Sequence, residues 1–268
     1  MARPGIGPPM GELVFIGLGL HDEKGITLRG LEEARGCDHL FAEFYTSALV
    51  GTKIQSIEAL LEKRVTILSR EDVERGSALL DAARARRVGF LVPGDPMVAT
   101  THVDLRLRAA EAGIPTRIVH GVSIQSAAAG VLGLQAYKFG RTTTVPFPAP
   151  GFHPTSPLEV ILENRRAGLH TLVLLDLQED GTFLPPHAAL RQLLEASSSL
   201  GAEAFGPTTV VCVVSRVGSS DVRAIAAPVA ELLDRDLGPP LHCLVVPGAL
   251  HFLEKKALVA FAGAPRDV

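Results

Sequence analysis

Short apolar runs alternate with amphipathic stretches along most of the chain. Residues 13–16 are all apolar and precede Gly17, as in a strand that is buried on both faces. Thr27 can then cap a stretch in which apolar residues recur at helical spacing. Strands and helices that alternate in this way indicate βαβ units.

The same pattern assigns elements to the rest of the chain. Ser69 and Asp72 have the spacing of a capping box, with Asp where Glu or Gln is usual, and predict the start of a helix. Gly168 follows a helical stretch at the position where glycine best tolerates left-handed backbone. We expect strands at 13–17, 38–44, 65–68, 88–92, 116–120, 142–147, 170–177, 208–215 and 242–246, and helices at 28–35, 56–63, 70–86, 101–112, 124–131, 158–167, 186–197, 228–236 and 250–262.

The alternation of predicted strands and helices is interrupted at residues 133–142. The chain has 268 residues, and at about 150 residues per domain this length favours two domains. We therefore predict an α/β protein with α/β domains at 13–134 and 135–268, preceded by a flexible Pro- and Gly-rich arm at 1–12. No apolar run approaches the roughly 18 residues of a membrane span, and the arm lacks the apolar core of a secretory signal.

Composition narrows the class of protein. Hydrophobic residues make up 47% and charged residues 21%, which excludes a disordered or fibrous chain. A net charge of −3 gives no global basic field, so we expect no direct binding of nucleic acid. Cys37, Cys212 and Cys243 form no metal-binding pair, and the last two lie in apolar runs that predict buried, reduced thiols. No clustered metal-ligand motif is present, and we expect no metal.

Glycines directly follow the first strand, in Gly17-Leu18-Gly19-Leu20. Such glycines allow a ligand to approach the backbone closely, although a tight turn required by the fold is the alternative interpretation. Asp22 stands where a dinucleotide fingerprint has its third glycine, which argues against a pyrophosphate at this loop.

Three further positions could carry chemistry, each with a structural alternative. Asp95 in Pro93-Gly94-Asp95-Pro96 can receive ribose hydroxyls or an ammonium group, or it can serve an ordinary turn. Ser123 can bind a carboxylate at a helix start or simply cap the helix. His242 opens a strand and is more often structural than catalytic, and the same holds for His102, His120 and His170.

Several strings, in order from about residue 13 to the end, resemble those of the diphthine synthases. They are 15–20 (FIGLGL), 41–47 (FAEFYTS), 68–73 (LSREDV), 93–102 (PGDPMVATTH), 137–140 (YKFG), 168–172 (GLHTL), 246–248 (VPG) and 263–266 (GAPR). The resemblance implies a fold of the tetrapyrrole methylase type, with S-adenosylmethionine in a cleft between two α/β domains, and a homodimer.

The resemblance also implies an activity. Such an enzyme is cytoplasmic and methylates the amino group of the 3-amino-3-carboxypropyl histidine of translation elongation factor 2, which gives diphthine and S-adenosylhomocysteine in diphthamide biosynthesis. An archaeal-type member would add three methyl groups. Two alternatives stay open: a methyltransferase of the same fold acting on a corrin precursor or ribosomal RNA, and a non-catalytic nucleotide-binding protein.

The resemblance further implies which residues contact the cofactor. Leu20, Val98, Ile124 and Leu175 would form an apolar cradle for the cofactor, and Asp95 and Ser123 would anchor its polar groups. Val217 departs from the family, in which alanine is frequent at this position. No general base is assigned, and Glu43, Asp95 or Asp176 would favour a cationic product electrostatically. The predicted contacts are Leu20, Asp95, Val98, Ser123, Ile124, Leu175, Val217 and His242.

Overall fold

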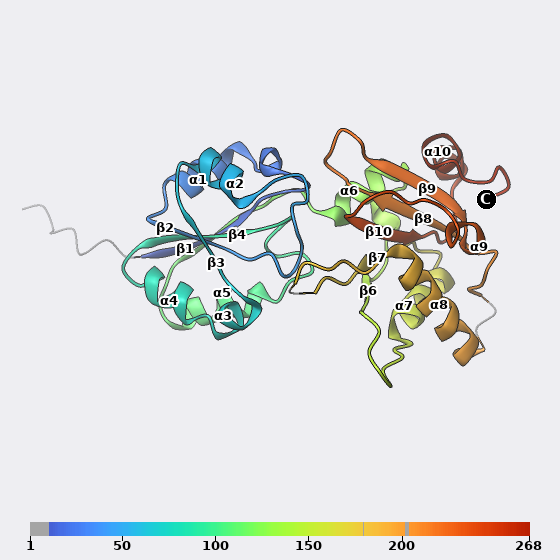
Figure 1. Cartoon of the computed structure of the whole chain (residues 1–268), viewed down its shortest axis with the longest axis horizontal. Helices are drawn as coiled ribbons and strands as arrows, with labels where there is room; N and C mark the ends of the chain where they lie inside the picture. The colour runs from blue at the N-terminus through green and yellow to red at the C-terminus, as the bar shows by residue number, and fades with distance from the viewer. Residues whose placement is uncertain (1–10, 179, 202–203) are drawn as a thin grey trace, which may run out of the picture. The chain divides into compact units, whose positions relative to one another are not determined.

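The computed structural model describes residues 11–178, 180–201 and 204–268 (Figure 1). These residues form two compact units, which divide between Ser123 and Ile124. Residues 1–10 of the predicted arm lie outside the described residues. The division between the units precedes helix α6 (Ile124–Leu132), whereas the sequence placed the domain boundary after this helix. The reason is packing, because Ala128 and Leu132 of α6 belong to a core cluster of the second unit.

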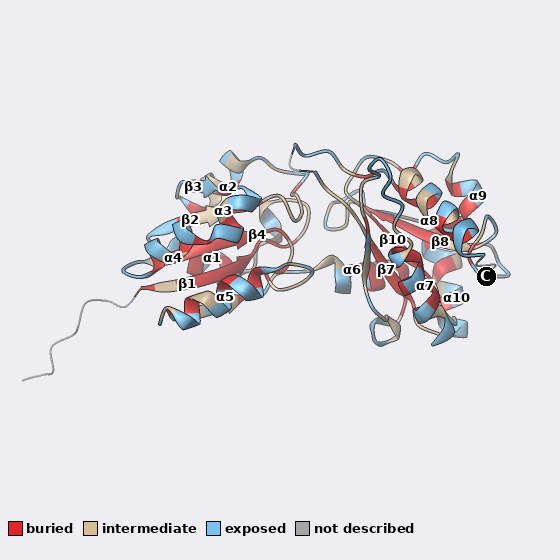
Figure 2. Ribbon diagram, turned by 90° about the horizontal axis from the view of Figure 1, so that it is seen from below, coloured by how far each residue is buried: buried red, intermediate tan, exposed pale blue. Residues whose placement is uncertain are grey.

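The first unit contains a parallel sheet with helices on both faces (Figures 1 and 2). Its strand order is β3-β2-β4-β1-β5. Because all neighbouring strands are parallel, the carboxyl ends of the five strands lie along one edge of the sheet. The elements are β1 (Glu12–Gly17), η1 (Glu23–Gly25), α1 (Leu28–Arg35), β2 (His39–Ala42), α2 (Ile54–Leu61), β3 (Val65–Ile67), α3 (Arg70–Arg75), α4 (Ser77–Ala83), β4 (Arg87–Val92), α5 (His102–Glu111) and β5 (Thr116–Val119).

Both faces of this sheet are buried, which explains the continuous apolar run of β1. Phe15 packs into the cluster under α3, α4 and α5, and its neighbour Ile16 packs into the cluster under α1 and α2. Successive side chains of a strand point to opposite faces, so residues 13–16, which are covered on both faces, are all apolar. The predicted parallel α/β unit is therefore confirmed.

The helix predicted at 70–86 is two helices. Ser69 and Asp72 do form the capping box, with the Ser69 hydroxyl accepting from the Asp72 amide at 3.1 Å. Gly76 then adopts φ +72° and separates α3 from α4. A Cβ at this residue would lie 2.5 Å from a guanidinium nitrogen of Arg108, which is the end of a flexible side chain, so the left-handed backbone is the reason for glycine here.

The second unit contains a mixed sheet with strand order β6-β7-β10-β8-β9. Strands β6 and β7 are parallel, and the other neighbours are antiparallel. Helices α7, α8 and α9 pack against one face, and α6 and α10 against the other. The elements after α6 are η2 (Ala136–Lys138), β6 (Thr143–Val145), α7 (Ser156–Arg166), β7 (Thr171–Leu175), α8 (Pro186–Leu200), β8 (Val210–Ser215), β9 (Arg223–Pro228), α9 (Val229–Leu232), β10 (His242–Val246) and α10 (Phe252–Ala262).

Strand β9 has no counterpart among the predicted elements. Its sequence, RAIAAP, is rich in alanine, which has low β propensity. It is a strand because it pairs with β8 along its whole length, from Val210 opposite Pro228 to Ser215 opposite Arg223. The helix predicted at 228–236 is correspondingly short and ends at Leu232.

The burial predicted for the two thiols in the second unit is confirmed. Cys212 lies in β8 and Cys243 in β10, and both are free and buried. Burial raises the pKa of each thiol to about 12.

None of the helices within the described part of the chain has the length and apolar character to cross a membrane.

Candidate functional site

Three loops meet at the carboxyl edge of the first sheet. Gly17 ends β1, Gly94 follows β4 and Gly121 follows β5, and these strands are neighbours. A Cβ at Gly17 would lie 2.5 Å from the amide nitrogen of Gly121 and 2.6 Å from the carbonyl oxygen of Gly94, and a Cβ at Gly121 would lie 2.2 Å from that same oxygen. The loops therefore touch through their backbones, and this close contact explains why residue 17 is glycine.

The loops after β1 and β4 are also joined by two hydrogen bonds. The Gly19 amide donates to the Gly94 carbonyl at 3.1 Å, and the Gly94 amide donates to the Gly19 carbonyl at 2.7 Å. Both glycines have positive φ, +73° and +71°. A Cβ at Gly94 would meet nothing closer than 4.0 Å, so its left-handed backbone and not crowding is what requires glycine there.

Asp95 is buried in the middle of this edge, at 7% exposure. Its Oδ1 accepts from the Met97 amide at 2.9 Å, and its Oδ2 lies 2.7 Å from Nδ1 of His120, directly after β5. The imidazole of His120 is 72% exposed. Nothing in the sequence indicated this pair, because the two residues are 25 positions apart and each belongs to its own loop.

The same edge holds other residues that the sequence had singled out. Leu20 and Val98 are half-buried, and Ser123 is the last residue of the first unit. The carboxylate of Glu43, after β2, is buried and accepts from the amides of Tyr45 and Thr46 at 3.0 Å each. Burial raises the pKa of Glu43.

In the second unit the topology brings three predicted residues together. Leu175 ends β7, Val217 follows β8, and His242 opens β10. Because β10 runs antiparallel to both neighbours, its start lies beside their ends: His242 is opposite Ser215, and Cys243 is opposite Leu174.

At this edge of the second sheet, where β7 and β8 end and β10 begins, the side chains divide between the two faces of the sheet. Ile124 and Val217 pack with the cluster under α6 and α10, whereas Leu175 packs with the cluster under α7 and α8. His242 is half-buried with Nε2 3.2 Å from the Leu237 carbonyl, and burial lowers the pKa of its imidazole. His242 is therefore neutral at neutral pH.

Asp176, the first residue after β7, holds the loops beside this edge. Its Oδ2 accepts from the Phe147 amide at 3.1 Å, and its Oδ1 accepts from the Leu177 amide at 2.9 Å. Both carboxylate oxygens are thus engaged with backbone.

These residues suit an adenosyl sulfonium ligand better than a dinucleotide. The five apolar predicted residues are half-buried within their own units, so each keeps apolar surface that a ligand can cover. Asp95 supplies a negative charge at the first edge. Asp22 accepts from the Lys24 amide at 3.0 Å and caps η1, so a carboxylate stands where a dinucleotide fingerprint has its third glycine.

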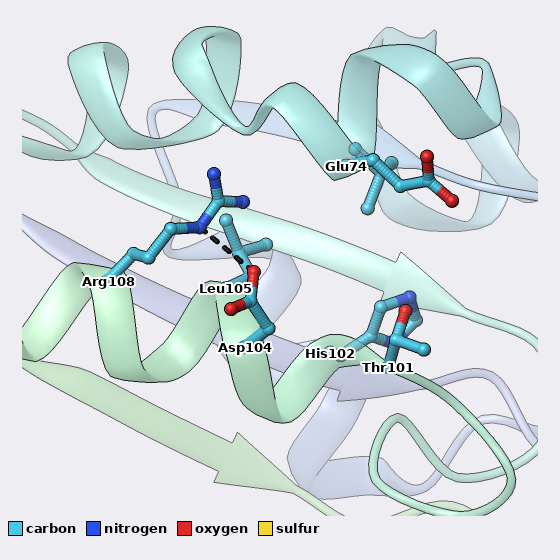
Figure 3. A pocket seen from close by; sticks show the side chains of 7 residues that line it. Glu74, Thr101, His102, Asp104, Leu105 and Arg108 are labelled. Carbon is cyan, nitrogen blue, oxygen red and sulfur yellow. Dashed lines mark ion pairs between the residues drawn. The ribbon is translucent and has the colours of Figure 1, made fainter.

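A cavity of about 210 Å³ in the first unit contains none of the predicted cofactor residues (Figure 3). It lies between α3 and α5, and an ion pair of Arg108 with Asp104, at 3.1 Å, forms part of its wall. His102 also lines this cavity; it is 1% exposed, has Nδ1 2.9 Å from the Pro96 carbonyl, and packs edge-on against Phe90. His102 therefore belongs to the core.

Within the described ranges, no group of three or more metal-ligating side chains is placed to hold a metal ion.

Comparison with known proteins defines the family. The model for the tetrapyrrole (corrin/porphyrin) methylases matches residues 12–233. Diphthine synthases of Methanosarcina mazei and Methanothermobacter thermautotrophicus are 47% and 45% identical to the chain; each alignment covers 96% of the chain, and 98% and 97% of the relatives. A crystal structure of diphthine synthase superposes with a TM-score of 0.87 at 37% identity, covering 95% of this chain and 97% of the other.

The fold is thus that of a tetrapyrrole methylase, a class of methyltransferases. Within that class the chain belongs to the diphthine synthase family. It is an enzyme of diphthamide biosynthesis, and its family implies use of S-adenosylmethionine.

Proposed function

We propose that this enzyme transfers methyl groups from S-adenosylmethionine to the amino group of the 3-amino-3-carboxypropyl histidine of translation elongation factor 2, giving diphthine. The observation that carries the proposal is the near-complete alignment with diphthine synthases at 45–47% identity. The two sheet edges support it, because their half-buried apolar residues and the buried Asp95 suit a cofactor without phosphates.

We assign cofactor binding to the eight residues predicted from the sequence, four in each unit. The bound cofactor supplies an electrophilic methyl group on a positively charged sulfur. Half-buried apolar side chains, such as Leu20 and Val98, cover its apolar surface, and Asp95 offers a carboxylate to its hydroxyl or ammonium groups. Alignment of the acceptor nitrogen with the methyl carbon is then the main catalytic requirement.

The finer features follow the same family assignment. We propose a cytoplasmic homodimer that adds three methyl groups and acts on a protein partner, elongation factor 2. We expect no direct contact with nucleic acid or membrane, and no metal.

The function is tested by methyl transfer from radiolabelled S-adenosylmethionine to purified elongation factor 2 that carries the aminocarboxypropyl histidine. We expect label on this protein and none on precorrin or ribosomal subunits, and mass spectrometry then counts the methyl groups. Label on precorrin or on ribosomal RNA, with none on elongation factor 2, would assign the chain to another activity of the same fold.

His242→Ala tests the assignment of cofactor binding in the second unit. We expect calorimetry to show binding of S-adenosylhomocysteine weakened by about tenfold, equivalent to about 1.4 kcal/mol, with methyl transfer largely restored at saturating cofactor. His153→Ala is the control, because His153 is exposed in the loop before α7. Unchanged affinity together with a lost reaction rate would instead make His242 a catalytic group.

A further inference from the structure

We propose that His120, oriented by Asp95, accepts the proton that the substrate amine releases at each methyl transfer. The inference rests on the proposed function, because it needs an amine acceptor at the first sheet edge. It assigns a catalytic role to a histidine that the sequence suggested was structural.

The hydrogen bond between the two side chains fixes the state of the imidazole. The Asp95 carboxylate can only accept, so the Nδ1 of His120 carries the hydrogen of the 2.7 Å contact. Nε2 of the neutral ring is then the proton acceptor. Asp–His pairs of this kind orient the general base in hydrolases, where the carboxylate also stabilises the imidazolium that forms.

The backbone around the pair holds it in place before any ligand binds. Gly121, next to His120, is in contact with the carbonyl of Gly94, the residue before Asp95. The Asp95 carboxylate is further held by the Met97 amide at 2.9 Å. The two loops therefore cannot move apart without breaking backbone contacts, and a base held in this way needs no rearrangement to reach its working geometry.

Exposure distinguishes His120 from the other basic groups at this edge. The carboxylate of Glu43 is fully buried and bonded to its own loop, and Nδ1 of His102 is bonded to the Pro96 carbonyl in the core. The ring of His21 lies against Gly51, and its Nδ1 is buried. His120 is 72% exposed, and its one hydrogen bond within the described chain is at Nδ1, so Nε2 can both meet a substrate and pass a proton to water.

The chemistry needs such an acceptor. An aliphatic amine next to a free carboxylate has a pKa above neutral pH, so at neutral pH most of it is ammonium and has no lone pair to react. In each transfer a proton leaves the nitrogen for His120 Nε2, the freed lone pair forms the bond to the methyl carbon, and the carbon–sulfur bond breaks with its electrons remaining on sulfur. Three rounds add three methyl groups, release three protons to water through His120, and leave one positive charge on nitrogen.

The test uses the full-length enzyme with S-adenosylmethionine and elongation factor 2 carrying the aminocarboxypropyl histidine. His120→Gln keeps a side-chain donor for Asp95 but removes the base, and we expect the single-turnover rate of methyl transfer to fall about 100- to 1,000-fold with unchanged binding of S-adenosylhomocysteine. In His120→Ala, added imidazole should restore part of the lost rate, which a purely structural role does not allow. His39→Gln is the matched control, because His39 begins β2 at the opposite edge of the same sheet.

The outcomes separate the inference from the proposed function. If the wild-type enzyme transfers no methyl group to elongation factor 2, the proposed function fails. If the wild type is active and His120→Gln keeps the wild-type rate, or imidazole does not restore His120→Ala, the assignment of His120 is overturned while the proposed function stands.

Discussion

Gly121→Ala is expected to lower the rate of methyl transfer about 100-fold, the scale of loss that follows a displacement of roughly 1 Å at a reacting centre. The added Cβ would lie 2.2 Å from the Gly94 carbonyl oxygen and 3.0 Å from the Cα of Gly17, so the loops after β1, β4 and β5 must separate. Backbone strain is not the cause, because Gly121 lacks a positive φ. The same displacement moves Asp95 relative to His120, and we expect binding of S-adenosylhomocysteine to weaken with the rate.

Overpacking of this kind costs about 1–3 kcal/mol of folding free energy, which denaturant unfolding measures. Gly206→Ala is the matched control, since a Cβ there would meet nothing within 4 Å and its φ is not positive. Wild-type affinity and rate in Gly121→Ala would show that the contact between these loops is not required for the site.

Glu254→Ala is expected to destabilise the second unit by about 3–5 kcal/mol, the cost of removing one partner from a buried ion pair. Glu254 lies in the first turn of α10 and is completely buried. Its Oε1 accepts from the Gln135 amide at 2.9 Å and from Nε2 of His170 at 3.0 Å. Its Oε2 accepts from the His251 amide at 2.8 Å and from the ammonium group of Lys138.

This carboxylate joins three elements that are distant in sequence: η2, the start of β7 and the N-terminus of α10. His170 extends the network, because its Nδ1 accepts from the Gly248 amide at 2.9 Å, which leaves Nε2 as the donor to Glu254. Glu254→Gln keeps the volume, so its loss of stability reports the charge and hydrogen bonds and not a cavity. Urea unfolding followed by circular dichroism measures both variants, with exposed Glu195→Ala on α8 as the control. A loss below about 1 kcal/mol, as at exposed ion pairs, would contradict this role.

The contribution of Glu254 should disappear in acid. Burial alone would raise the pKa of the carboxyl, but the hydrogen bonds from Lys138, the two amides and His170 outweigh burial and lower the pKa from 4.5 to about 2. A group whose pKa is lower in the folded state stabilises the fold above its unfolded pKa and loses this contribution as the pH falls through the folded pKa. The shift corresponds to about 3 kcal/mol. The stability difference between wild type and Glu254→Ala should therefore shrink as the pH falls below 4.5.

The sequence by itself determined the elements whose causes are local. The apolar run of β1 specifies a doubly buried strand, and Thr27 caps α1 through the Gly30 amide at 2.9 Å. Ser69 and Asp72 cap α3 as their spacing predicts. In the two caps the interacting groups lie three residues apart, so they meet whatever the rest of the chain does. The strings from residue 13 onward also identified the family, because their order along the chain is itself specific.

The tertiary structure decided what depends on segments that are distant in sequence. Strand β9 forms because β8 offers it a partner, although its own residues favour other structure. His242 lies beside the ends of β7 and β8 only because β10 runs antiparallel to both. Asp95 meets His120 across 25 residues. Hydrogen bonds and close contacts of this kind depend on strand order and loop approach, and neither periodicity nor residue type along one stretch of chain specifies them.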